Sequence, residues 1–448
     1  MSKENNFTEG PILKQLITFM LPILAALLLQ TLYSTVDLVI VGQFASTASV
    51  SGVSMGGQIV GFMTYMISGM ATAVTIILGR YIGEKRLSEA GNVIGTSIFF
   101  FSFLTVVIIA VLCIFPEPLL NLINMPAESM SEGIIYTQIC GAGYVFVTAY
   151  NLLGCIFRGI GDSKTPLLTV GIACVVNIFG DLLLVGIFHM AAAGAAIATI
   201  FAQAMSVALS LIVTKKKGLP FKIERAHIRP HWRLMLQLLK MAFPLAINEI
   251  FLGVSFMILS AILNNLGLVQ SASVGVGGKL STFIMLFTSA FSQSLSAFVA
   301  QNIGARRLSR ANKSLIYAIL IAIGFACIMF YFSFIHGEWL TALFSNDPEV
   351  IAASADYLKS YAIDTFFTSV VFCTCGYLNG CGKTHITMIQ CLVGVAARVP
   401  AAFILSSVPE ASMFVIGLAT PISTVCQLIY LMSYLAFSRK SMRQQYQE

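Results

Sequence analysis

The chain has 448 residues, of which 57% are hydrophobic and only 10% are charged. A soluble domain carries roughly 25% charged residues, so this composition cannot build a water-facing surface around a 48.4 kDa protein. The mean hydropathy of +0.88 leads to the same conclusion. A soluble enzyme, a disordered chain and a disulfide scaffold are therefore excluded, and lipid is the expected solvent.

Twelve apolar runs follow one another along the chain, each long enough for the roughly 20 residues of a membrane helix. The first run exceeds the roughly 7–15 apolar residues of a signal-peptide core, so we expect it to be retained. Continuous rather than alternating runs predict α-helices. The predicted spans cover residues 13–41, 54–78, 93–115, 133–157, 166–188, 191–213, 234–263, 275–300, 314–335, 354–378, 385–407 and 411–437.

The positive charges alternate with these spans. Of the 26 Lys and Arg residues, 23 lie at the two termini or in the loops after spans two, four, six, eight and ten. Positively charged loops stay on the cytoplasmic side, so both termini are predicted to be cytoplasmic. The basic stretch 214–233 is expected to anchor this topology, with lipid or ligand recognition as the alternative.

The two halves of the chain repeat each other at an offset of 221 or 222 residues. The segment 81–88 recurs at 302–309, 158–162 recurs at 379–383, and Pro22 pairs with Pro244. Six spans per half give a parallel repeat, which is typical of transporters with two moving bundles. The predicted fold is all-α and integral to the membrane. It has two pseudo-symmetric six-helix bundles, residues 1–213 and 234–448, joined by the linker 214–233.

Acidic residues inside spans are costly and therefore mark candidate functional sites. At 1.5 Å per residue, Asp37 and Asp181 reach similar depths in the outer half of the first bundle. Asn177 shares the helix face of Asp181, while Thr199 and Gln203 share a face of span six. These oxygens suit a hard cation or a shared proton, so Asp37, Asn177, Asp181 and Thr199 are the predicted ion-coupling site. The alternative is a polar pair that only holds the bundle together.

The second bundle carries its own charges inside spans: Glu249, Asp364 and Arg398. A buried arginine requires a carboxylate partner, so either acid is expected to pair with Arg398 or to face the substrate. The predicted substrate cavity is completed by further polar residues of the first bundle. Its members are Gln30, Tyr33, Asn151, Gln203, Glu249, Asp364 and Arg398.

The chain resembles the multidrug and toxic compound extrusion (MATE) transporters of bacteria over nearly its whole length. The resemblance rests on short motifs in span one and after spans two and four, and it is most specific in spans five and six. The matching residues are Pro22, Val36-Asp37, Val41-Gly42, Gly83, Arg86-Leu87, Arg158 to Asp162, Asn177 to Asp181, Gly194-Ala195-Ala196 and Thr199 to Gln203.

This resemblance implies a secondary antiporter in the bacterial inner membrane that exports amphipathic organic cations in exchange for Na⁺ or H⁺. It assigns coupling to Asp37, Asn177, Asp181 and Thr199, and a further polar position to Asn151. No cofactor, nucleic acid or enzymatic activity is expected, and a two-bundle chain is expected to act as a monomer. A flippase for lipid-linked sugars is the alternative function, although it would call for more basic residues than Arg398 in the cavity.

Overall fold

The computed structural model contains helices and connecting loops only, within the residues that it describes. These residues are 6–221, 227, 229–264, 267–409 and 411–446, with the side chains of 264, 268 and 439–446 left undescribed. Part of the predicted linker 214–233 and the cations Lys3, Lys222 and Arg225 lie outside the described residues, as do the side chains of Arg439, Lys440 and Arg443. The prediction of an all-helical membrane protein is confirmed.

Among the described residues, eleven helices are long and apolar enough to cross a membrane, or twelve when one bent pair counts as a single span. Each predicted span lies within one of them or extends beyond its end by at most two residues. The first half comprises α1 (Ile12–Phe44), α2 (Thr47–Gly83), α3 (Leu87–Ile114), α4 (Pro116–Leu122), α5 (Met130–Ala142), α6 (Tyr144–Gly159), α7 (Lys164–Asp181) with a π-helix (Leu182–Ile187), and α8 (Ala191–Lys217).

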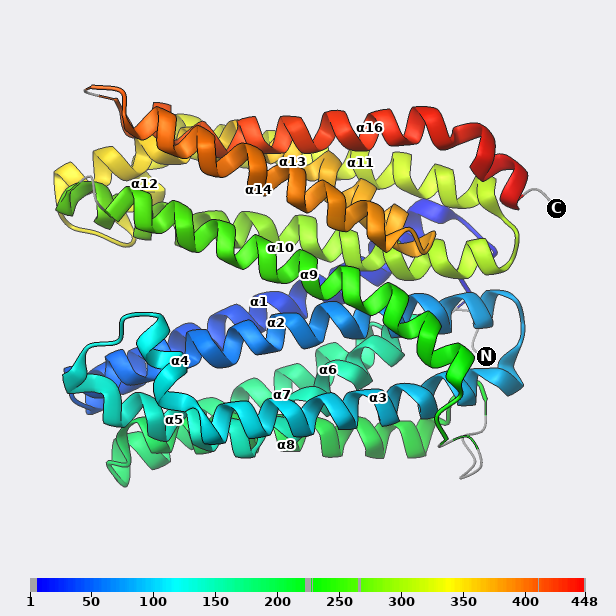
Figure 1. Cartoon of the computed structure of the whole chain (residues 1–448), viewed down its shortest axis with the longest axis horizontal. Coiled ribbons are helices and arrows are strands. Elements are labelled where there is room, and N and C mark those ends of the chain that lie inside the picture. The colour runs from blue at the N-terminus through cyan, green and yellow to red at the C-terminus, as the bar shows by residue number, and fades with distance from the viewer. Residues whose placement is uncertain (1–5, 222–226, 228, 265–266, 410, 447–448) are drawn as a thin grey trace. The chain divides into compact units, whose positions relative to one another are not determined.

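The second half also supplies six of the candidate spans (Figure 1). In it α13 packs against α10, α11, α14 and α16, and 67% of its most apolar stretch is buried. The elements are α9 (Trp232–Asn264), α10 (Leu268–Gly304), α11 (Leu308–Phe330) with a π-helix (Tyr331–Ile335), α12 (Gly337–Ala342), α13 (Pro348–Gly380), α14 (Thr384–Ser406), α15 (Met413–Gly417) and α16 (Ala419–Tyr446).

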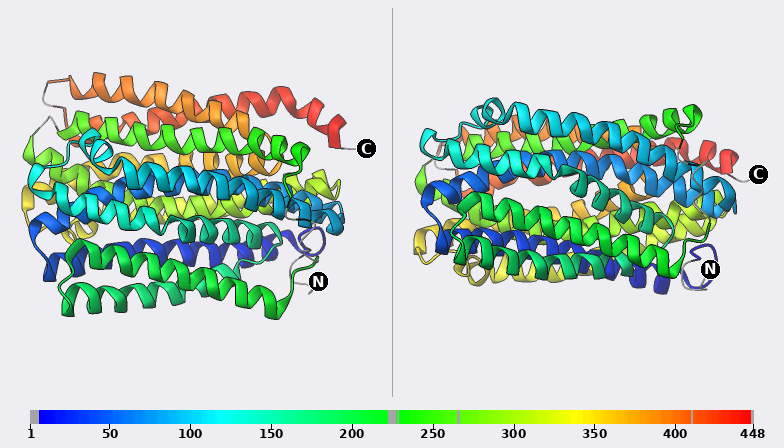
Figure 2. Two further views of the ribbon diagram at one scale, coloured as in Figure 1. Left: turned by 60° about the horizontal axis from the view of Figure 1, so that its bottom comes forward. Right: turned by 90° about the horizontal axis from the view of Figure 1, so that it is seen from below.

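The fourth span is broken where the sequence predicted one continuous helix over 133–157. The segment Ala127–Ala142 and α6 meet at Gly143 with a bend of 54°. The Cβ of any larger residue at Gly143 would stand 2.3 Å from the side chain of Ile200, so α8 passes close to the break. In the two views of Figure 2 the long helices of this half run roughly alongside one another.

The sequence repeat is also a repeat of backbone geometry. Lys85 and Arg306, 221 residues apart, both have a left-handed φ, of 60° and 57°. Each follows the long second helix of its half and closes the same pattern of turn hydrogen bonds. A side-chain hydrogen bond repeats at the same offset: Thr75 donates to the carbonyl of Cys155, and Ser296 to that of Gly376.

The second and fourth spans of each half approach so closely that glycine is required between them. At Gly380, an added Cβ would stand 2.6 Å from the Cβ of Val299, and at Gly376 it would stand 2.5 Å from the backbone oxygen of Ser292. Small residues allow membrane helices to pack backbone against backbone, where van der Waals contact replaces the missing hydrophobic drive. The α10–α13 contact is built in this way.

Substitution Gly376→Ala is therefore expected to destabilise the protein by about 1–3 kcal/mol, because the new methyl group meets a backbone rather than a movable side chain. Thermal melting of the detergent-purified protein measures the loss. Gly324→Ala, on α11 of the same half, is the matched control because an added Cβ there meets no atom within 4 Å. Equal melting temperatures for both variants would contradict the close-packing argument.

Packing divides the chain into two compact units. The beginning of the first helix of each half belongs to the unit formed mainly by the other half. One unit contains residues 21–246 and the other contains 7–20 together with 247–448. The predicted bundles 1–213 and 234–448 follow the sequence repeat, whereas α1 and α9 each run through both units. The prolines Pro22 and Pro244 lie close to these two crossing points and interrupt helix hydrogen bonding there.

Candidate functional site

Asp37 is a buried carboxylate on α1, with 6% of the residue exposed. Thr199 on α8 donates a hydrogen bond from its hydroxyl to Oδ2 of Asp37, at 3.4 Å. The other oxygen, Oδ1, has no hydrogen-bond partner. Half of this carboxylate is therefore left without a donor inside the bundle.

Asp181 and Asn177 lie one turn apart at the end of α7 and are 0% and 1% exposed. Both lie next to the Asp37 carboxyl group. Among the residues that the structure describes, no hydrogen bond of standard geometry reaches the carboxylate oxygens of Asp181 or the amide atoms of Asn177. The four residues predicted for ion coupling are thus brought together from α1, α7 and α8.

The surroundings of the two carboxylates are apolar. Ile40 and Val41, one turn beyond Asp37, belong to a buried cluster with Val185 and Ala195. Within the described part of the chain, no Lys, Arg or His nitrogen lies within 4.0 Å of Asp37 or Asp181. Thr199 donates one hydrogen bond to this pair, and the described residues supply no counter-charge within ion-pair distance. Two buried carboxylates in such surroundings are unstable as a pair of anions, and a proton or a cation would stabilise them.

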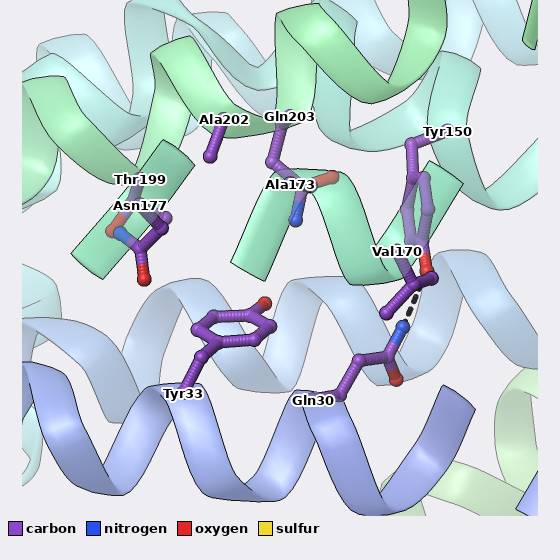
Figure 3. Close-up of a pocket in the computed structure, with 9 residues that line it drawn as sticks. All are labelled: Gln30, Tyr33, Tyr150, Val170, Ala173, Asn177, Thr199, Ala202 and Gln203. Atoms are coloured by element: carbon purple, nitrogen blue, oxygen red, sulfur yellow. Dashed lines mark hydrogen bonds between the residues drawn. The ribbon is translucent and has the colours of Figure 1, made fainter. Parts of the chain in front are cut away.

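A small pocket lies beside this group (Figure 3). Asn177 and Thr199 line it, so it shares two residues with the carboxylate group. Three residues predicted for the cavity, Gln30, Tyr33 and Gln203, also line it. In Figure 3 the Tyr33 ring extends from α1 across the pocket toward Gln203 of α8. The lining is completed by Tyr150, Val170, Ala173 and Ala202.

Tyr150 is a lining residue that the sequence did not indicate. Its hydroxyl accepts a hydrogen bond from the Gln30 amide (dashed in Figure 3), which ties α6 to α1 at one end of the pocket. The neighbouring Asn151, predicted for the cavity, instead donates to the carbonyl of Val147 on its own helix and is not among the lining residues. A tyrosine in an apolar span carries no signal that separates it from ordinary packing.

The predicted residues Glu249, Asp364 and Arg398 belong to the other compact unit. Asp364 is buried and accepts a hydrogen bond at 2.7 Å from Thr368, one turn along α13. Among the described residues its second oxygen accepts no hydrogen bond of standard geometry, and Thr424 of α16 is a further polar neighbour of the carboxyl group. These contacts all lie within the unit that contains 247–448.

Arg398 differs from its prediction. The expected direct carboxylate partner is missing, because no acidic oxygen in the described part of the chain lies within 4.0 Å of the guanidinium. Instead Nη1 donates to the hydroxyl of Ser255 at 3.3 Å, and the guanidinium lies 4.6 Å from the centre of the Phe256 ring. A cation–π contact and a hydroxyl thus replace the expected ion pair.

No cluster of three or more His, Cys, Asp or Glu side chains among the described residues is arranged to hold a metal ion. The site therefore offers two carboxylates, one amide and one hydroxyl. Such oxygens suit a proton or a monovalent hard cation rather than a bound transition metal.

Comparison with known proteins places this arrangement in a family. The MatE family model matches residues 22–183 and again 244–404, the same offset as the internal repeat. The probable multidrug resistance protein YpnP of Bacillus subtilis is 27% identical over 87% of this chain and 86% of its own. The probable multidrug resistance protein NorM of Thermotoga maritima is 24% identical over 88% of this chain and 85% of its own.

Solved structures show the same fold. A structure described as the outward-facing conformation of a multidrug resistance MATE family transporter has a TM-score of 0.92 at 17% identity, covering 99% of each chain. A MOP superfamily transporter from Pyrococcus furiosus has a TM-score of 0.89 at 17% identity and covers 98% of each chain. The duplicated family match and this fold establish that the chain belongs to the MatE family, the multidrug and toxic compound extrusion (MATE) transporters of cell membranes.

Proposed function

We propose that the protein is a secondary antiporter that exports amphipathic organic cations in exchange for Na⁺ or H⁺. One observation carries the proposal: Asp37 and Asp181 are buried together with no basic side chain of the described residues in ion-pair contact, next to a pocket that is lined by Asn177 and Thr199. An ion that binds the carboxylates and a substrate that enters the pocket therefore act on the same helices. Binding of one changes the free energy of binding the other.

The chemistry of the pocket supports a cationic substrate. Two carboxylates attract positive charge, and the rings of Tyr33 and Tyr150 offer faces for an aromatic or quaternary ammonium group. Relatives named as multidrug resistance and multidrug export proteins agree with this substrate class. We place the protein in a bacterial inner membrane as a monomer with both termini in the cytoplasm, where 23 of its 26 cationic residues would then lie.

Vesicles containing the purified protein test this function. An imposed Na⁺ or H⁺ gradient is expected to drive ethidium across the membrane, and the gradient that works identifies the coupling ion. Protein-free vesicles with the same gradient give the leak rate. The proposal fails if neither gradient drives ethidium, or a second organic cation such as tetraphenylphosphonium, faster than this leak.

An anionic substrate is the second candidate function, and Arg398 is the observation that favours it. This buried guanidinium has no carboxylate within contact distance, and its Nε has no hydrogen-bond partner. One relative, from Shewanella oneidensis, is named an FAD transporter and is 25% identical over 80% of this chain. Transport of an anionic lipid-linked sugar or dinucleotide in the same vesicles, lost in Arg398→Gln, would support this alternative.

A further inference from the structure

The segment before α1 is docked against the junction of α10 and α11. Phe7 is only 2% exposed, and its ring packs against Phe19 at 4.8 Å and Phe298 at 5.2 Å between centroids. Gln301 accepts a hydrogen bond from the Phe7 amide, and Asn302 donates to the Phe7 carbonyl. All of these residues belong to the unit that contains 247–448.

All three guanidinium nitrogens of Arg310 donate hydrogen bonds to this segment. Nε donates to the carbonyl of Phe7 at 2.8 Å, Nη1 to that of Gly10 at 2.6 Å, and Nη2 to that of Glu9 at 3.1 Å. Nη2 also donates to Oε1 of Gln15 at 2.6 Å, within the first turns of α1. Gly10, with φ at +84°, makes the turn that presents these carbonyls. We refer to Arg310 with residues 7–10 as the α1 clamp.

The first half of the chain has no such arginine at the repeated position. The counterpart of Arg310, 221 residues earlier, is Glu89, which pairs with Arg86 on an exposed surface at 2.6 Å. The counterpart of Phe7 is Arg229, whose carbonyl accepts a hydrogen bond from the Thr96 hydroxyl at 3.5 Å and lies 3.0 Å from Nδ1 of His231. The α1 clamp is therefore an addition to one half of a duplicated fold, not a feature that the repeat requires.

The helix that the clamp holds is the one that carries the candidate site. α1 runs unbroken from Ile12 to Phe44, but residues up to Met20 pack in one compact unit and those from Leu21 onward in the other. Gln30, Tyr33 and Asp37 all follow on the same helix. From Ile12 to Asp37 the helix rises about 38 Å.

We propose that Arg310 is a positioning residue for ion-coupled transport: it fixes the first turns of α1 on the second unit, so that displacement of Asp37 and Tyr33 is transmitted there. A helix with a free end would absorb the same displacement by fraying and sliding. The hydrogen bonds from the Arg310 guanidinium oppose fraying and sliding of α1, because either movement would break charge-assisted hydrogen bonds. This inference rests on the proposed antiport function.

The test uses the full-length protein in vesicles and compares Arg310→Ala with Arg86→Ala. Arg86, the repeat counterpart of Arg307, has a 46% exposed side chain, and its ion pairs with Glu84 and Glu89 and its contact with the Tyr81 ring all lie at the surface of the first half, so its removal is the control. Three quantities are measured for each variant: hydrogen exchange of the amides of residues 7–15, equilibrium affinity for ethidium, and the ion-driven rate of ethidium transport. Phe7→Ala removes the apolar side of the clamp and serves as the second variant.

In Arg310→Ala we expect exchange at residues 7–15 to accelerate about tenfold and the ion-driven rate to fall about tenfold, while ethidium affinity stays within about twofold. Phe7→Ala is expected to act in the same direction, Arg310→Lys to restore part of the rate, and Arg86→Ala to resemble the unmodified protein. The inference is overturned if Arg310→Ala releases residues 7–15 but transports at the normal rate. A parallel loss of affinity and rate would equally overturn it, since it would indicate general unfolding. If the unmodified protein shows no ion-driven transport, the proposed function itself fails.

Discussion

Replacement of Asp37 or Asp181 by asparagine is expected to abolish ion-driven export. The amide keeps the size of the side chain but can neither bind a proton nor carry the negative charge that holds a cation. An ion gradient supplies about 2.3 kcal/mol per charge per 100 mV. At 1.4 kcal/mol per factor of ten, this supports about a 50-fold accumulation of substrate. Without the carboxylate, accumulation of ethidium in vesicles should fall to that of gradient-free vesicles.

Asp162→Asn is the matched control for this prediction. Asp162 lies in the same unit, where its oxygens cap the start of α7 and approach Lys217 at 3.8 Å near the surface. Its amide still offers a capping oxygen, so ion-driven accumulation should persist. Asp37→Asn combined with Asp181→Asn should be no worse than either alone, because one exchange site is lost in each case. Normal accumulation by the double variant would refute the site and direct attention to Asp364.

Substitution Tyr33→Ala is expected to weaken ethidium binding about tenfold or more. Burial of an aromatic side chain against a ligand contributes about 1.5–3 kcal/mol, and a cation over the ring adds about 0.5–2 kcal/mol. The Tyr33 ring already lies across a narrow pocket in the free protein, so only part of this burial free energy is gained when ethidium binds. Fluorescence titration of the purified protein with ethidium measures the change in Kd.

Tyr65→Ala is the control for Tyr33, since Tyr65 is 65% exposed on the outside of α2 and lines no part of the pocket. It should bind ethidium normally. The ion-driven rate of Tyr33→Ala at saturating ethidium should also change less than its Kd, because Asp37 and Asp181 remain in place. Unchanged ethidium affinity in Tyr33→Ala would remove the pocket from the substrate path.

The helices and the acidic site were predictable for a shared physical reason. Span length follows from membrane thickness and depth from helix rise, so residues far apart in sequence, such as Asp37 and Asp181, can be placed at one level. Thr199 was found in the same way, and its hydrogen bond to Asp37 agrees with that placement. The roles of these residues in coupling remain predictions.

Three features could not be predicted because they depend on the direction of a helix axis or of a side chain, which the composition of a span does not record. The break at Gly143 leaves the apolar run intact and alters only the course of the helix. Tyr150 faces the pocket while its neighbour Asn151 bonds to its own helix, which residue polarity alone would have reversed. Arg398 contacts a hydroxyl group and an aromatic ring, whereas charge pairing predicted a contact with a carboxylate.

The exchange of helix ends between the compact units has a consequence for folding during synthesis. Phe7 is synthesised long before its partners Gln301, Asn302 and Arg310, which follow 294 to 303 residues later. Synthesis at roughly 5–20 residues per second leaves this segment without its partners for about 15 seconds to a minute. The unit formed by 21–246 likewise stays incomplete until the start of α9 has been made. The segment 7–10 therefore waits for partners made much later, and chains truncated before Arg310 should lack both the α1 clamp and its protection from proteases.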